Sequence, residues 1–258
     1  GERLALVDRA LAMADEVDVD AFAEDVVSAA LVRAQFLDDK DEVLRGYDLI
    51  LDQGVLRVAD WDPALHFRLE EVLEAKKAFT GDDGLKRRFY DRIIARNANP
   101  YSVAFALLEK AKATIGRAEK EALFERIVAT YGEDDDDRLQ RVVNDTLFHA
   151  VDFSSHPAEK IQIYERIVES GTESADPELR LQAVRALFSR AELSDERTEM
   201  IGFDDRAISL CGSDGDRLRE HRAAAFRRRA RLMGEVVPDS AVDKGDFGEE
   251  GDDDKLLM

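Results

Sequence analysis

A five-residue motif recurs along this chain at intervals of about forty residues. It consists of an apolar or aromatic residue, an acid, usually Arg, and then two aliphatic residues. The copies begin at Val7, Tyr47, Tyr90, Phe124 and Tyr164, with a divergent last copy at Asp204. The steps between these first residues are 40, 43, 34, 40 and 40. A fixed period of this size indicates an array of structural repeats, in which each unit packs mainly on its neighbours.

The segments between the motifs open with signals for the start of a helix. Asp62, Asn99 and Asp176 each precede a proline. An Asp or Asn side chain at that place can accept hydrogen bonds from the free amides of the first turn, and proline fits the first helical position. Asp136 occupies the matching place without a proline after it. These residues are therefore predicted to be N-caps.

Both kinds of segment have an apolar face with helical spacing. The clearest example has apolar residues at every fourth position: Leu179, Ala183, Leu187 and Ala191. This spacing places them on one side of a helix. Each repeat is thus predicted to be an antiparallel pair, made of a motif helix and an intervening helix. The motif helices are expected at 2–14, 39–53, 82–96, 117–131, 157–170 and 196–211, and the intervening helices at 20–37, 63–79, 100–115, 137–153, 177–193 and 216–233.

Four glycines stand close to the expected ends of motif helices: Gly54, Gly132, Gly171 and Gly212. Glycine enters the left-handed backbone conformation at little cost, and it commonly ends helices for that reason. We expect these four residues to be C-caps.

The pattern predicts an all-α fold, a solenoid of about six antiparallel helical hairpins over residues 1–233. Its first helix is a motif helix, the second half of a unit, so more of the array or another domain is expected before Gly1. Residues 234–258 are rich in Asp, Glu and Gly. Such a composition buries too little apolar surface to offset the entropy of ordering, so this acidic tail is predicted to be disordered.

The net charge and the single cysteine restrict which functions and which compartment are expected. The 258 residues carry a formal net charge of −20, which repels nucleic acid and anionic membranes. The single cysteine, Cys211, cannot form a disulfide within the chain, and this favours a reducing compartment. The sequence shows neither a signal-peptide pattern nor an apolar run long enough to span a bilayer. A cytoplasmic protein without a membrane segment is expected.

The helix pairs resemble tetratricopeptide repeats of the divergent bacterial kind. The resemblance covers roughly residues 1–233, and its best stretch joins the motif at Tyr164 to the segment 176–191. The period near forty is longer than that family's, which is about 34. The resemblance implies a right-handed superhelix whose concave face binds a peptide or a partner protein. It implies no catalytic residues.

Polar residues opposite the apolar stripe of two intervening segments are candidates for this concave face. In the segments that begin at Asp137 and Pro177, Asp145 and His149 stand forty residues before Arg185 and Ser189. The candidate partner-binding residues are Asn144, Asp145, His149, Arg185, Ser189 and Arg190. A mixed polar groove of this kind suits an extended peptide. The alternative is that they are ordinary exposed helix residues.

The last intervening segment is rich in arginine, although the chain as a whole is acidic. The candidate residues for docking an acidic group are Arg217, Arg222, Arg228 and Arg229. The acidic group could belong to a partner or to the chain's own tail at 234–258. Two further alternatives remain: a nucleic-acid surface, which the net charge disfavours, and a solvated helix that caps the array.

No residue pattern points to a cofactor, a metal or a catalytic group. The four histidines show no metal-ligand spacing, and the acidic run 133–137 lacks the spacing of a calcium loop. The sequence therefore predicts a binding protein and not an enzyme: a scaffold, an adaptor or a sensor module. The alternatives are a regulatory domain of a larger enzyme or defence-system protein, and a nucleic-acid binder acting through the Arg-rich helix. The partner's identity is left open.

Overall fold

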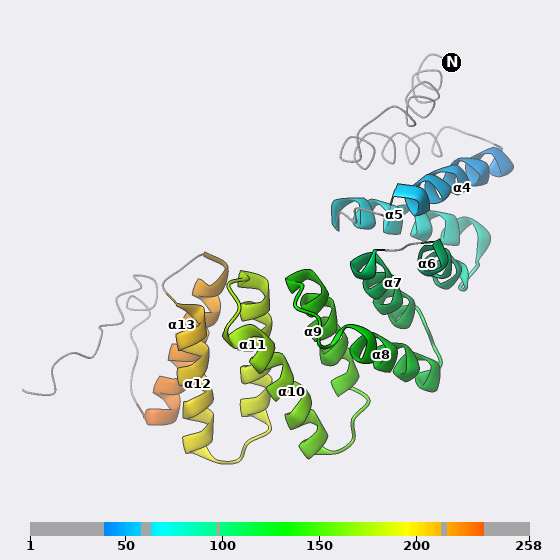
Figure 1. Cartoon of the computed structure of the whole chain (residues 1–258). Coiled ribbons are helices and arrows are strands. Elements are labelled where there is room, and N and C mark those ends of the chain that lie inside the picture. The colour runs from blue at the N-terminus through cyan, green and yellow to red at the C-terminus, as the bar shows by residue number, and fades with distance from the viewer. Residues whose placement is uncertain (1–38, 58–62, 97–98, 213–215, 235–258) are drawn as a thin grey trace, which may run out of the picture. The chain divides into compact units, whose positions relative to one another are not determined.

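The structure, a computed structural model, describes residues 39–57, 63–96, 99–212 and 216–234. Within these ranges every regular element is an α-helix (Figure 1). The chain divides into two compact units, Gly1–Glu133 and Asp134–Met258. The all-α prediction is confirmed for the described residues. The helices expected at 2–14 and 20–37 lie outside them, as does the expected tail after Gly234.

The helix boundaries follow the sequence pattern closely. The motif helices are α4 (Lys40–Arg57), α6 (Leu85–Arg96), α8 (Arg117–Tyr131), α10 (Pro157–Thr172) and α12 (Arg197–Cys211). The intervening helices are α5 (Pro63–Thr80), α7 (Pro100–Lys112), α9 (Asp137–Val151), α11 (Pro177–Glu192) and α13 (Asp216–Met233). The largest difference is at α4, which continues a turn beyond its expected end. In the described part of the chain, no helix combines the length and the apolar character that crossing a membrane requires.

Side-chain caps start three of the intervening helices as predicted. Asn99 Oδ1 accepts from the amide of Tyr101 at 2.9 Å. Asp136 Oδ1 accepts from the amide of Arg138 at 2.7 Å, and Asp176 accepts from that of Glu178 at 2.9 Å. Each cap satisfies amides that have no partner within the helix. The expected cap at Asp62 lies outside the described residues.

Two of the four predicted glycine caps, Gly212 and Gly132, are C-caps, and the other two are not. Gly212 ends α12 with a positive φ of 57°, as a glycine C-cap should. Gly132 caps α8 in the right-handed region, with φ −66°, so the left-handed conformation is not used there. Gly54 lies inside α4, and Gly171 lies inside α10.

Gly171 is a packing residue. A Cβ atom at this position would lie 2.5 Å from the carbonyl oxygen of Leu179 and 2.6 Å from the Cβ of Ala183. Both of these residues belong to α11. Glycine is therefore required at position 171 because α10 and α11 come too close there for any side chain.

The turns from intervening helix to motif helix repeat at intervals of forty residues. In three of them a Ser or Thr amide donates to a carbonyl three residues earlier: Thr114 to Ala111 at 3.1 Å, Ser154 to Val151 at 3.2 Å, and Ser194 to Ala191 at 3.2 Å. The Ser194 hydroxyl also donates to Glu199 at 2.5 Å, and Ser154 donates to Glu159 at 2.6 Å. The sequence period is thus also a period of local structure.

The motif's apolar positions form the core. The aromatic side chains of Tyr47, Tyr90 and Phe124 are buried, and so are the aliphatic residues Ile93, Ile127 and Ile167. In the first unit Tyr47, Tyr90 and Ile93 join one apolar cluster with α5, to which Leu69, Val72 and Leu73 contribute. Burying such side chains is the main favourable contribution to folding.

The motif's acid forms an ion pair with the next intervening helix. The pairs are Asp48–Lys76, Asp91–Lys110 (2.7 Å), Glu165–Arg190 (3.7 Å) and Asp205–Arg229 (2.6 Å). The motif's Arg pairs with an acid of the preceding motif helix in two copies: Arg92 with Asp52, and Arg206 with Glu165 at 3.8 Å. The charged positions of the motif therefore join consecutive helices.

Candidate functional site

In the second unit, α11 contacts both α9 and α13, the intervening helices before and after it. The candidate binding residues lie on α9 and α11. His149 and Arg185 are exposed, and Ser189 is half-buried. The Arg185 guanidinium lies 5.0 Å from the centre of the Phe148 ring, so a cation–π contact joins the two helices here.

Asn144 is placed differently from the prediction. It is only 1% exposed, and its amide nitrogen donates to Ser170 Oγ at 2.8 Å and to Gln182 Oε1 at 3.1 Å. These bonds tie α9 to α10 and to α11. The prediction that Asn144 faces a partner is corrected: its amide satisfies other buried polar groups, as burial requires.

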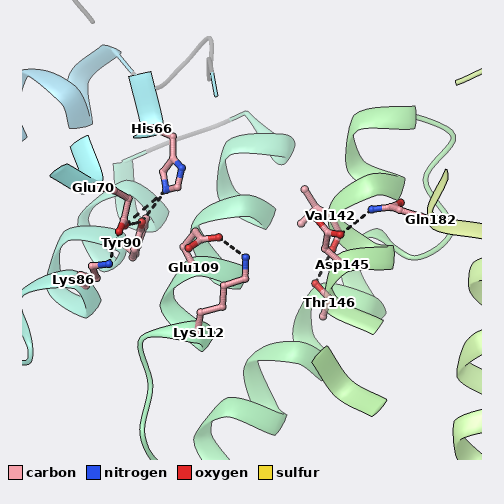
Figure 2. A network of polar contacts seen from close by, with 10 residues as sticks. All are labelled: His66, Glu70, Lys86, Tyr90, Glu109, Lys112, Val142, Asp145, Thr146 and Gln182. Carbon is pink, nitrogen blue, oxygen red and sulfur yellow. Dashed lines mark hydrogen bonds and ion pairs between the residues drawn. The ribbon is translucent and has the colours of Figure 1, made fainter. Parts of the chain in front are cut away.

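Gln182 extends this network and was missed by the sequence reasoning. Its amide nitrogen donates to Asp145 Oδ1 at 2.8 Å and to the carbonyl oxygen of Arg141 at 3.2 Å. Figure 2 shows Asp145 on α9 pointing toward Gln182 on α11. The signal was present in the sequence, since Gln182 stands forty residues after the apolar Val142. Asp145 is half-buried and held in place by this contact.

Arg190 also contributes mainly to packing. Its side chain is 12% exposed and lies near Glu165. The guanidinium is 4.8 Å from the centre of the Phe203 ring on α12. The remaining exposed candidates on this surface are His149 and Arg185, with Ser189 beside them. We call these three the α9–α11 surface.

The arginines of α13 make contacts within the unit. Arg228 pairs with Asp204, and its guanidinium stacks over the Phe188 ring at 4.6 Å. Arg229 pairs with Asp205 at 2.6 Å. Acids of α12 already pair with these two arginines and so compete with an acidic partner or the tail; docking at Arg228 and Arg229 stays a prediction.

The other two docking candidates differ from each other. Arg222 is half-buried, with its guanidinium 5.6 Å from the centre of the Phe226 ring. Arg217 belongs to the first turn of α13, and its side chain lies outside the described residues.

Asp204 occupies the position at which the other described motifs have an aromatic ring. The side chain is 0% exposed, and Oδ2 has no hydrogen-bond partner. Burial raises the pKa of this carboxyl, while the nearby Arg228 opposes the rise. A buried carboxylate with one charged partner is costly for the fold, because the partner's attraction only partly replaces hydration.

A polar cluster lies where α5, α6 and α7 meet in the first unit. His66 Nε2 is 3.0 Å from Tyr90 Oη and 3.8 Å from Glu70 Oε1. Tyr90 donates to Glu70, and Lys86 donates to the other oxygen of the same carboxylate. On α7, Glu109 accepts from Lys112 at 2.7 Å (Figure 2). One ligand atom from each of His66, Glu70 and Glu109 lies within 4.8 Å of the others.

Burial decides the protonation states in this cluster. Loss of hydration lowers the pKa of His66 below its ordinary 6.5, and the charges of Glu109 and Glu70 oppose this effect. The ring is therefore neutral at neutral pH. Burial raises the pKa of Tyr90, and the charge of Glu70 adds to the rise. Tyr90 remains a neutral hydroxyl that can donate to Glu70.

The sequence reasoning missed this cluster. His66 and Glu70 are four residues apart on α5, a spacing that brings side chains together on a helix. Glu109 stands 39 residues after Glu70, close to the repeat period. Glu70 also lines a shallow surface hollow with Tyr47, Phe67 and Glu74. The side chains of His66, Glu70 and Glu109 are 16%, 21% and 15% exposed, so solvent reaches the cluster.

No protein-family model matches this chain, and a search of the curated proteins finds no match.

Proposed function

We propose that this chain is a helical-repeat module that binds a peptide or a partner protein. In this proposal consecutive helices form antiparallel hairpins, and the hairpins stack as a solenoid of the tetratricopeptide type. The module serves as a scaffold, an adaptor or a sensor. Its chemistry is recognition and not catalysis, and its compartment is the cytoplasm.

The observation that supports the proposal most is the forty-residue recurrence of local structure. The turns at Thr114, Ser154 and Ser194 have the same backbone hydrogen bond. The ion pairs of the motif recur with it. Repeats that share turns and inter-helix contacts form arrays, and arrays offer an extended surface for partners.

The α9–α11 surface supports a specific mode of binding. Arg185 stacks on Phe148, so its guanidinium is held in place while it stays exposed. Holding a charged group before binding reduces the entropy lost when a partner docks. Arg185 can pair with a carboxylate, while His149 and Ser189 offer hydrogen-bonding groups beside it. The partner that fits is an extended peptide with an acidic side chain.

The nucleic-acid alternative has less support. Arg228 and Arg229 are paired with Asp204 and Asp205, so they have little charge to offer a phosphate. The net charge of −20 adds a general repulsion. A regulatory domain within a larger enzyme or defence-system protein is compatible with the same binding surface.

Selection from a random peptide library tests the proposal. The purified chain is used to select binding peptides, and their affinity is measured by fluorescence anisotropy. We expect enrichment of peptides that contain Asp or Glu. Their affinity should fall at least about tenfold in Arg185→Glu, because the substitution replaces an attraction with a repulsion.

Arg197→Glu is the matched control. Arg197 is also an exposed arginine, but it is the first residue of α12. The control should bind the selected peptides as the unmodified chain does. A library that yields no enriched sequence, or peptides that lose affinity equally in both variants, would contradict the proposal.

A further inference from the structure

We propose that His66, Glu70 and Glu109 form a binding site for a single divalent metal ion of the zinc class. The site is separate from the α9–α11 surface, and the proposal does not depend on peptide binding. His66 and Glu70 come from α5, and Glu109 comes from α7. Figure 2 shows His66 and Glu70 pointing toward the α6 residue Tyr90.

The three ligand atoms already lie close together. They are within 4.8 Å of one another, and the His66 Nε2 to Glu70 Oε1 distance is 3.8 Å. Ligand atoms around a tetrahedral zinc ion, each about 2.1 Å from the metal, are about 3.4 Å apart. The ligand atoms must therefore come somewhat closer together, and an ion bound between them would replace the contacts that the Tyr90 hydroxyl makes with His66 Nε2 and Glu70 Oε1.

Neighbouring side chains hold the ligands in suitable orientations. The His66 ring packs at 76° against Phe105, with 4.6 Å between ring centres. Lys86 holds Glu70 through Oε2, while Oε1 accepts from the Tyr90 hydroxyl and lies 3.8 Å from His66 Nε2. Lys112 holds Glu109 through Oε1 at 2.7 Å. Contacts of this kind fix the direction in which a ligand side chain points.

The donor set selects the class of metal. One imidazole nitrogen and two carboxylate oxygens match zinc and neighbouring divalent transition metals. Calcium and magnesium prefer six or more oxygen ligands and do not favour a histidine. Three protein ligands leave a position for water.

The two lysines have a consequence that distinguishes a metal site from a simple polar cluster. Lys112 pairs with Glu109, and Lys86 pairs with both Glu70 and Glu74, so a bound divalent ion must share the two ligand carboxylates with these lysines. Lys112 is the more exposed of the two, at 38%. Its removal leaves Glu109 with uncompensated negative charge next to His66. Metal affinity should then rise, whereas a cluster that binds no metal would gain nothing.

The experiment titrates the full chain, freed of metal by chelation, with Zn²⁺ in a calorimeter. We expect one tight equivalent and an increase in the midpoint of thermal unfolding, since the ion joins α5 to α7. Affinity should fall at least about tenfold in His66→Ala and in Glu109→Gln, because each loses one ligand. It should rise severalfold in Lys112→Met. Co²⁺ in place of Zn²⁺ should give visible absorption bands that His66→Ala lacks.

Two controls make the result decisive. His156→Ala removes an exposed histidine at the start of α10 and should leave Zn²⁺ binding unchanged. Mg²⁺ should produce no increase in the unfolding midpoint. Circular dichroism verifies that each variant is folded, and Glu109→Gln provides the test if His66→Ala is not.

The proposal is overturned if the chain binds no Zn²⁺ at millimolar concentration. It is also overturned if folded ligand variants bind as the unmodified chain does, since that would mean adventitious binding to an acidic surface.

Discussion

Arg228 of α13 donates a hydrogen bond to the fully buried carboxylate of Asp204 in α12, with 2.7 Å between Nε and Oδ1. In the preceding repeat the corresponding motif residue is Tyr164, which contacts the Phe148 ring with 6.4 Å between ring centres. In the last repeat, Arg228 contacts both Asp204 and the Phe188 ring. An ion pair covered by a ring thus replaces a contact between two rings.

Removing Arg228 should destabilise the chain strongly. Arg228→Ala leaves the Asp204 carboxylate buried without its partner, and losing one member of such a pair costs about 3 kcal/mol. Urea denaturation followed by circular dichroism measures the loss. Arg231→Ala on the same helix is the control; Arg231 is exposed, so its removal should change the unfolding free energy by less than about 0.5 kcal/mol. Equal effects in the two variants would mean that the Asp204–Arg228 contact does not support the fold.

The stability contributed by Asp204 should depend on pH in a defined direction. Burial raises its folded-state pKa above the ordinary 3.8. The folded chain then binds the proton more tightly than the unfolded chain does. This contribution is fully present below pH 3.8 and is lost as the pH rises through the folded pKa.

Asp204→Asn serves as the reference for this effect, because asparagine keeps the size of the side chain and does not ionise. The unfolding free energy of the unmodified chain, minus that of Asp204→Asn, should decrease with rising pH and then level off. Urea titrations between about pH 3.5 and 7.5 measure this difference. A difference that increases with pH would mean that Arg228 outweighs burial and lowers the pKa of Asp204.

Replacing either of two glycines in motif helices by alanine should change the stability of the chain, but in opposite directions. Gly171→Ala places a methyl group against the backbone of Leu179, so α10 and α11 must separate, at a cost of about 1–3 kcal/mol. Gly202 lies within α12, and a Cβ atom there has nothing within 4 Å. Gly202→Ala should stabilise the chain by about 0.5–1 kcal/mol, because it reduces the flexibility of the unfolded state. Thermal unfolding of both variants measures the pair of effects, and two changes of the same sign would contradict the close approach of α10 and α11.

Cys211 should be unreactive in the folded chain. The side chain is buried, and burial raises the pKa of its thiol to about 11, although the charges of Arg222 and Arg180 oppose the rise. Little thiolate is present at neutral pH, and the thiolate is the reactive form. A colorimetric thiol reagent should therefore label the chain only slowly at neutral pH and rapidly in urea. Rapid labelling without urea would show that the end of α12 opens readily.

The helices and most of their starts could be predicted because their signals are local. Apolar spacing and the side chains of Asn99, Asp136 and Asp176 act within a single turn of helix. The need for glycine at position 171 could not be predicted in this way. Glycine is needed there because the backbone of α11 lies very close, and the sequence alone does not state how closely two helices approach.

The candidate binding residues, too, could be predicted only where their placement does not depend on how helices pack. Comparing positions forty residues apart correctly paired α9 with α11, and it found Arg185 and His149 exposed. It misplaced Asn144, because a polar residue on an otherwise apolar face is buried when a partner such as Gln182 satisfies it. It also missed the approach of Glu109 to His66, which depends on how α5 and α7 pack.

If α9 and α11 present one surface to an extended peptide, hydrogen–deuterium exchange of the chain with and without a library-selected peptide should detect it. The peptide should slow exchange in α9 and α11, and Arg185→Glu should abolish the slowing while Arg197→Glu retains it. Slowing confined to α10 and α12, the motif helices, would mean that the peptide does not bind the α9–α11 surface.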